Sequence, residues 1–156
     1  MAGRWVTIGV LGSLLLTGCA KPAGSAAAGV LPSGALDHYI GDAIGDPTTC
    51  VVIADRATRK VLYRYGQLFN CVRGLPACDR PGVMSAENAL ALADTVDGRG
   101  ASCPTSADGT RRVGWAEARI AGKRGLVYSA VMEGERALPG QEMMGRLAEA
   151  FANAGL

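Results

Sequence analysis

The stretch CVVIADRATRKVLYRY, residues 50–65, decides the fold. It opens with a continuous apolar run from Cys50 to Ala54, with two valines and an isoleucine, which is typical of a buried strand. Residues 55–59 are polar and turn-like, and residues 60–65 form a second run that is rich in β-branched and aromatic side chains. The stretch therefore predicts an antiparallel hairpin with a loop of about five residues.

The segments on either side of this hairpin predict three helices and a second hairpin. Each helix has a Ser or Pro at its start, apolar residues at three- and four-residue spacing, and a glycine at its end. The helices are expected over residues 33–44, 85–97 and 139–154, and the second hairpin from strands 112–120 and 126–132. Residues 67–84 and 98–111 show no period and are expected as loops. The order helix-strand-strand-helix-strand-strand-helix predicts an α+β domain with an antiparallel sheet.

The composition limits the classes of partner that the chain can bind. The 156 residues carry 16 Lys and Arg against 14 Asp and Glu, a formal net charge of +2. This length suits one domain with a short extension. No basic stripe or polybasic run is visible in the sequence, which argues against a nucleic-acid partner and against electrostatic binding to an anionic membrane.

The N-terminus predicts export. Arg4 precedes an apolar run from Val6 to Leu16, which is typical of a secretory signal and shorter than the about 20 residues of a membrane span. The run ends in Leu16-Thr17-Gly18-Cys19, which resembles the lipobox of bacterial lipoproteins. The resemblance implies cleavage before Cys19 and attachment of fatty acyl chains such as palmitate to Cys19.

A lipidated cysteine divides the chain into three parts. Residues 1–18 are a lipoprotein signal peptide, residues 19–34 a flexible tether rich in Ala, Gly, Ser and Pro, and residues 35–156 the domain. The domain is then expected to face the periplasm, held to the membrane by the lipid on Cys19. Ala20 stands where an Asp often retains such lipoproteins at the inner membrane, so the resemblance favours the outer membrane.

The remaining cysteines fit an oxidising compartment. Cys50, Cys71, Cys78 and Cys103 are even in number, so two disulfides are expected. Of the three possible pairings we favour Cys71–Cys78 with Cys50–Cys103. A zinc site is disfavoured because no Cys-x-x-Cys pair occurs and His38 is the only histidine.

The hairpin also carries a family resemblance. Residues 51–63, with an Asp-Arg-Ala-Thr turn followed by Val-Leu-Tyr, are similar to the opening hairpin of penicillin-binding proteins and serine β-lactamases. That resemblance implies a first helix before the hairpin, further antiparallel strands, and a long terminal helix across the sheet. The family's Ser-x-x-Lys motif is absent, because none of the seven serines is followed three residues later by lysine. If the kinship holds, the chain is a stripped, inactive version.

Other catalytic patterns are also missing, so the sequence leans away from an enzyme. No Gly-x-Ser-x-Gly elbow, phosphate-binding loop or dinucleotide-binding motif occurs, and no catalytic residue, metal or cofactor is predicted. The sheet instead predicts a binding surface that concentrates aromatic and charged side chains. Its candidate members are Tyr63, Arg64, Tyr65, Arg112, Trp115, Tyr128 and Glu133. Residues 70–80 are a second candidate, as a rigid recognition loop.

These observations favour a lipid-anchored cell-envelope protein with a small non-catalytic binding or structural domain. Its partner is an unidentified envelope protein or small ligand. The first alternative is a degenerate or accessory member of the penicillin-recognising serine hydrolases that acts at the cell wall. The second is a small-ligand sensor, because two hairpins with three helices also resemble profilin-like domains.

Overall fold

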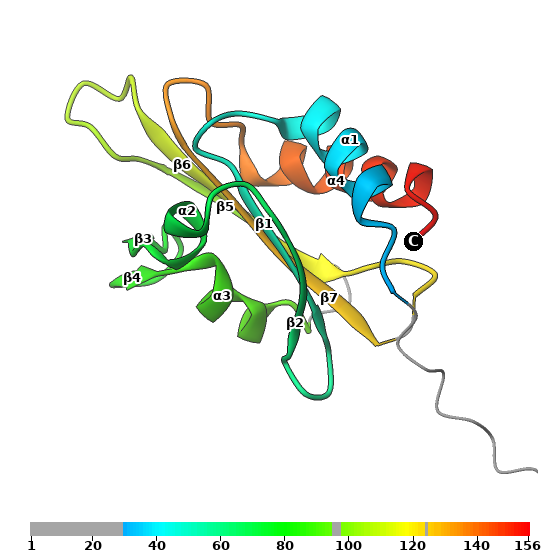
Figure 1. Ribbon diagram of the computed structural model, residues 1–156. Helices are drawn as coiled ribbons and strands as arrows, with labels where there is room; N and C mark the ends of the chain where they lie inside the picture. The colour runs from blue at the N-terminus through cyan, green and yellow to red at the C-terminus, as the bar shows by residue number, and fades with distance from the viewer. Residues whose placement is uncertain (1–29, 95–97, 124) are drawn as a thin grey trace, which may run out of the picture.

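A five-stranded antiparallel sheet forms the centre of the computed structural model, which describes residues 30–94, 98–123 and 125–156 (Figure 1). The strand order is β2 (Val61–Tyr65), β1 (Cys50–Asp55), β7 (Leu126–Gly134), β6 (Arg112–Arg119) and β5 (Arg99–Pro104). The predicted α+β class is confirmed, as are both predicted hairpins, β1–β2 and β6–β7. Pairing of β1 with β7 joins the two hairpins into one sheet.

Secondary structure covers both faces of the sheet. The helices α1 (Ser33–Ile44) and α4 (Gly140–Asn153) pack together on one face. The other face carries short elements: α2 (Leu68–Val72), β3 (Leu75–Pro76), β4 (Val83–Met84), α3 (Ala86–Ala89) and the 3₁₀ turn η1 (Leu90–Leu92). Figure 1 shows these two layers on opposite sides of the strands.

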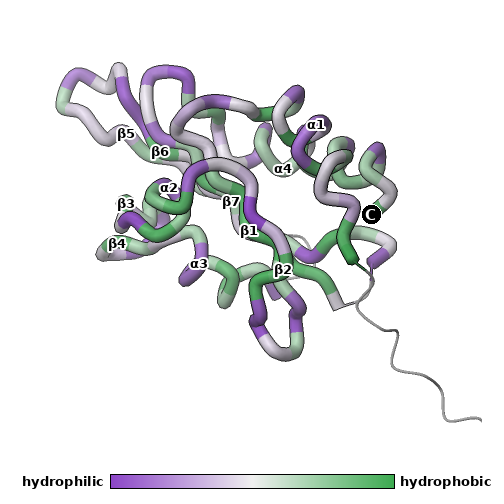
Figure 2. Tube along the Cα trace, in the orientation of Figure 1, coloured by the Kyte–Doolittle hydropathy of each residue, from purple (hydrophilic) through white to green (hydrophobic). Residues whose placement is uncertain are grey.

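This double covering explains the continuous apolar run in β1. Val51 and Ile53 pack in the core beneath α1 and α4, whereas Val52 and Ala54 pack in the second core beneath α2 and α3. A strand buried on both faces needs apolar residues at every position rather than at alternate ones. Figure 2 shows the result, with a hydrophobic β1 and a hydrophilic β1–β2 loop.

Three regions differ from the sequence expectation. Residues 67–84, expected as a loop, contain α2 and the paired strands β3 and β4, so α2 is a helix beyond the three expected. Residues 99–104, expected as loop, form the edge strand β5, which pairs with β6 over six residues. The small residues of this segment give no strand pattern in the sequence. Gly100 is required there because a Cβ would lie 2.7 Å from the backbone nitrogen of Gln141. The expected helix over residues 85–97 is reduced to α3 and η1, and residues 95–97 lie outside the described part of the chain.

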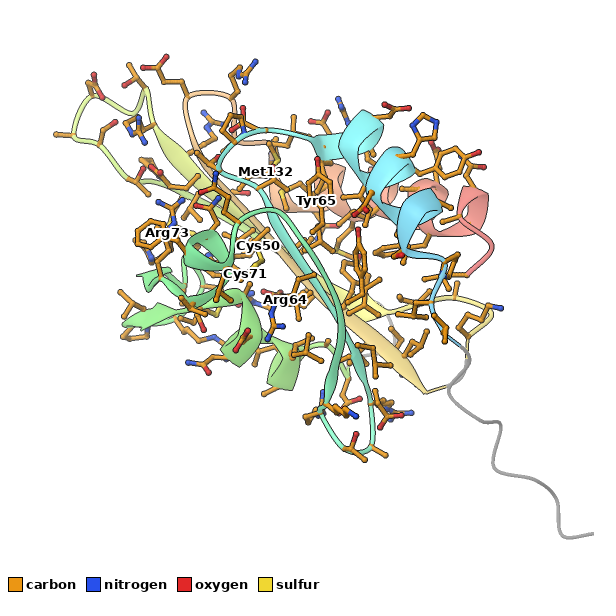
Figure 3. All side chains as sticks on the ribbon, viewed as in Figure 1. Cys50, Arg64, Tyr65, Cys71, Arg73 and Met132 are labelled. Atoms are coloured by element: carbon orange, nitrogen blue, oxygen red, sulfur yellow. A yellow bond between two sulfur atoms is a disulfide. The ribbon has the colours of Figure 1, made fainter. Side chains whose placement is uncertain are left out.

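The two predicted disulfides are present, but the favoured pairing is wrong. Cys50 pairs with Cys71, and Cys78 with Cys103, each with a Cα–Cα distance of 5.3 Å. The cause is topological, because α2 lies over the start of β1 while the segment after β3 reaches the edge strand β5. Figure 3 shows Cys50 and Cys71 side by side at α2.

Some sequence predictions fall outside the described residues. The signal peptide, Cys19 and residues 19–29 of the tether are among them. Within the residues that are described, every helix is too short or too polar to cross a bilayer.

Candidate recognition surface

The aromatic members of the predicted binding surface are divided between the two faces of the sheet. Tyr63 and Tyr128 are buried beneath α1 and α4, where the Tyr63 hydroxyl donates to Asp37 Oδ1 at 2.7 Å. Burial raises the pKa of both phenols. Trp115 is buried on the opposite face, and its Nε1 donates to the carbonyl of Pro76 at 2.7 Å. These rings are core residues rather than one exposed surface.

The remaining members are also dispersed. Arg64 and Tyr65 are neighbours on β2 and point to opposite faces, Tyr65 toward α1 and Arg64 toward α3 (Figure 3). Arg64 pairs with Glu87 on the α3 side. Arg112 is exposed at the start of β6, and Glu133 is mostly buried near the end of β7, 2.9 Å from Arg111 Nη2. The alternation of side chains along strands accounts for this dispersal.

A different group of side chains forms an exposed apolar surface. Leu68, Phe69 and Val72 on α2 are 60%, 65% and 48% exposed, and Val83 on β4 is 71% exposed. Among the described residues, Val30 is the one other large apolar side chain of comparable exposure. The turn after α2 brings the two elements together, because a Cβ at Gly74 would lie 3.3 Å from Val83 Cγ2. We call Leu68, Phe69, Val72 and Val83 the α2–β4 patch.

Covalent and hydrogen-bonded links hold the α2–β4 patch in place. The Cys50–Cys71 disulfide fastens α2 to β1, and Asn70 Nδ2 donates to the carbonyl of Pro47 at 2.8 Å. The Cys78–Cys103 disulfide and the Trp115–Pro76 hydrogen bond fasten the β3–β4 hairpin to the sheet. The patch is therefore exposed on a rigid support, which lowers the entropy lost when such a surface binds.

A charged group borders the patch. The Arg73 guanidinium lies 5.8 Å from the centre of the Phe69 ring, within the range of a cation–π contact. Arg73 Nη2 also lies 3.6 Å from Glu133 Oε2, which Arg111 binds from the other side. Arg73 Nε is buried without a hydrogen bond in the described structure. The cation next to Phe69 is therefore Arg73, which Glu133 links to Arg111.

A second polar cluster lies where β5 and β6 meet the segment after β3. Glu117 on β6 is fully buried and is bound by Arg99, which also binds Asp79. Burial raises the pKa of Glu117 to about 7, while hydrogen bonds from Arg99 lower the pKa of Asp79. Ser129, the register partner of Glu117 on β7, is also fully buried. The cluster ties the β3 segment to the sheet.

Two of the serines examined for hydrolase chemistry, Ser85 and Ser102, have structural roles. Ser85 Oγ caps α3 by accepting from the backbone nitrogen of Asn88, and Asn88 holds the position where the family motif needs lysine. Ser102 Oγ accepts from the backbone nitrogen of Gly140 at 2.8 Å. In the described residues, no three His, Cys, Asp or Glu side chains gather as metal ligands.

The α2–β4 patch was only partly foreseeable. Its α2 half overlaps the predicted recognition loop at residues 70–80, but Leu68, Phe69 and Val83 lie outside that range. The sequence signal was an apolar trio, Leu68, Phe69 and Val72, around a cysteine in a stretch without period. The exposure of these residues depends on Cys71 facing β1, which the sequence does not fix.

Comparison with known proteins adds no relative. No protein-family model matches the chain, and neither a curated protein nor a solved structure does.

Proposed function

We propose that this chain is a lipid-anchored cell-envelope protein that binds a partner protein through the α2–β4 patch. The observation that carries the proposal is the concentration of exposed large apolar side chains on α2 and β4. The other helices place their large apolar residues in the core, as Leu36 and Ile40 do on α1 and Leu147 does on α4. Clustered apolar exposure on a rigid element is typical of a protein interaction site.

The two disulfides support an envelope location for the proposed interaction. Disulfides persist in exported proteins and are rare in the cytosol, so their presence agrees with the lipobox at residues 16–19. Both bonds hold the elements that carry the patch, one through α2 and the other through the β3–β4 hairpin. An oxidising compartment would therefore be needed to keep the patch in its exposed arrangement.

The chemistry of the patch defines the partner. An aromatic ring flanked by aliphatic side chains favours an apolar segment, and Arg73 beside that ring favours a carboxylate next to the segment. The four side chains of the patch are about half exposed or more, so they do not enclose a ligand. A protein surface is therefore a better occupant than a buried small molecule.

Cross-linking in intact cells tests the proposed interaction. A photoreactive residue at position 69 or 83 should cross-link the same protein, and Val72→Asp should abolish both products. The matched control places the photoreactive residue at position 145 on the exposed side of α4, where no product should form. The same product from position 145, or none from 69 and 83, would refute the role of the patch. Acylation is tested separately by labelled fatty acid, which should be incorporated by the native chain and not by Cys19→Ala.

A second candidate is a degenerate relative of the penicillin-recognising serine hydrolases. The observation that favours it is the element order: a first helix, the β1–β2 hairpin, antiparallel strands, and a terminal helix on the same face as the first. The short elements from α2 to η1 would replace the catalytic helical domain. Fluorescent penicillin should not label the chain, because Asn88 stands where the base would be. Labelling that disappears in Ser85→Ala would instead establish hydrolase chemistry.

A further inference from the structure

Basic side chains that are distant in the sequence meet at one end of the sheet. Arg56 in the β1–β2 loop, Arg119 at the end of β6 and Lys123 in the β6–β7 turn line a hollow of about 630 Å³. The backbone nitrogen of Arg56 donates to the carbonyl of Gly125 at 2.7 Å, which holds the two loops together. We call this hollow the basic end pocket.

The charge at this end is strongly one-sided. Asp94 pairs with Arg56 and Arg59 together, and neither Arg119 nor Lys123 pairs with a carboxylate of the described residues. Among the described residues that line the hollow, Arg56, Arg119 and Lys123 are charged and none is a carboxylate. The sequence shows no polybasic run, so the fold creates a basic surface that the charge count of the chain conceals.

The described chain begins at the same end of the molecule. Asp37 binds Tyr63, and a Cβ at Gly41 would lie 3.3 Å from the Tyr65 hydroxyl, so α1 runs alongside β2 with its N-terminus toward Val61. Val61 pairs with Ala54, and the next residue of β1, Asp55, pairs with Leu126 at the pocket. Residues 30–32, which directly precede α1, therefore lie at the basic end of the domain.

The sequence length sets how far this end can be from a lipid on Cys19. Eleven residues, 20–30, lie between Cys19 and Leu31, which packs against the core beneath α1 and α4. A fully extended chain spans at most about 3.6 Å per residue, so the basic end would stay within about 40 Å of the membrane surface. Attraction between basic residues and anionic lipids acts within about a Debye length of the surface, which this tether allows the pocket to reach.

We propose that the basic end pocket binds the phosphate-bearing headgroups of anionic phospholipids in the membrane that holds the acyl chains. The inference rests on the proposed lipid anchor, which supplies the proximity. Arg119 and Lys123 provide charges that no described carboxylate neutralises, and Arg56 closes the hollow from the facing loop. The α2–β4 patch lies on a face of the sheet, whereas the basic end pocket lies at one end of it. Docking of that end on the membrane would therefore leave the patch pointing along the membrane surface, where an envelope partner can reach it.

Hydrogen exchange on the acylated full chain tests the inference. The chain is reconstituted into nanodiscs of phosphatidylcholine alone or of phosphatidylcholine mixed with phosphatidylglycerol. Amides of residues 55–59 and 119–123 should be protected in the mixed discs only, and high salt should remove the protection. Lys123→Gln should reduce that protection about fivefold, the effect of one basic residue near an anionic surface. Lys123 is exposed, so this variant keeps the fold.

The control is a cation at the far end of the same strand. Arg112 and Arg119 are seven residues apart on β6, so Arg112→Gln removes the same kind of charge about 23 Å from the pocket. It should leave the protection unchanged. Equal protection on both kinds of disc, equal loss in Arg112→Gln, or the same protection from inorganic phosphate without lipid would overturn the proposal. The intact mass of the same sample shows whether Cys19 is acylated, so failure of the anchor is recognised separately.

Discussion

Arg99 holds the buried carboxylate of Glu117 through contacts to both of its oxygens. Arg99 Nη1 lies 2.8 and 2.7 Å from the two carboxylate oxygens of Glu117, and the residues face each other directly across β5 and β6. Arg99 Nη2 donates to the carbonyl of Ala77 at 2.7 Å, and Arg99 Nε donates to Asp79 Oδ2 at 2.6 Å. One arginine therefore joins the sheet to the segment that carries the Cys78–Cys103 disulfide.

Removing Arg99 should destabilise the protein in a pH-dependent way. Arg99→Met leaves a buried carboxylate without its partner, which costs about 3–5 kcal/mol in the free energy of unfolding at pH 8. The loss should be smaller at pH 5, because burial raises the pKa of Glu117 to about 7 and the protonated acid is neutral. Denaturant unfolding of the oxidised protein at both pH values measures the difference.

The raised pKa of Glu117 also predicts the direction in which the stability of the native chain changes with pH. The folded-state pKa of Glu117 lies above its ordinary value of 4.5, so the folded state binds more protons in this range. The contribution of Glu117 to stability is greatest below pH 4.5 and is lost as pH rises through 7. Glu117→Gln should remove this slope. As a control, Arg56→Met breaks an exposed pair with Asp94 and should cost under about 1 kcal/mol at either pH.

Two glycines of α4 should respond oppositely to alanine. A Cβ at Gly140 would lie 2.1 Å from the carbonyl oxygen of Trp115 and 2.5 Å from the backbone nitrogen of Ala101. Gly140→Ala must therefore push α4 off β5 and β6, and we expect a loss above about 3 kcal/mol, comparable to severe core overpacking. A Cβ at Gly145 would have no atom within 4 Å apart from the neighbouring residues and backbone of its own helix, so Gly145→Ala should stabilise the helix by about 0.5–1 kcal/mol. Equal melting temperatures for the two variants would contradict the close packing at Gly140.

The disulfide pairing can be tested directly by peptide analysis. Peptide mapping without reduction should find Cys50 linked to Cys71 and Cys78 linked to Cys103. The bonds close loops of 21 and 25 residues, and chain entropy assigns each about 3 kcal/mol. Replacing either pair by serines should lower the free energy of unfolding by that amount. A Cys71–Cys78 peptide would show that α2 and the β3–β4 hairpin are held differently.

The sequence predicted the elements whose pattern is local. β1 could be found because it is apolar at every position, and α4 because Met143, Leu147 and Phe151 repeat along one face. The strand β5 could not, because Gly100, Ala101 and Ser102 have little intrinsic preference for strands and β5 is stabilised by its pairing with β6. Whether such an edge strand forms depends more on pairing with the neighbouring strand than on the intrinsic preferences of its own residues.

The candidate site was harder to predict than the fold, because it depends on which segments become neighbours. Tyr63 and Trp115 attract attention as aromatic strand residues, yet both are covered by elements whose position the sequence does not fix. Phe69 becomes exposed because Cys71, two residues on, turns inward to Cys50. Arg56 and Lys123 meet only through the pairing of β1 with β7. Long-range pairing was the missing information in each case.

Adjacent residues of β4 provide a test that separates a binding role of the α2–β4 patch from a structural one. Val83 is 71% exposed, whereas its neighbour Met84 is 9% exposed and belongs to the core beneath α2 and α3. Val83→Ser should change the free energy of unfolding by no more than about 0.5 kcal/mol, as expected for a surface position. Met84→Ser should cost about 2–5 kcal/mol, because it removes a buried side chain and leaves a hydroxyl in its place. If Val83→Ser is as stable as the native chain and still loses the cross-linked partner, the patch acts in binding; a large loss of stability in Val83→Ser would instead assign Val83 to the packing of the β3–β4 hairpin.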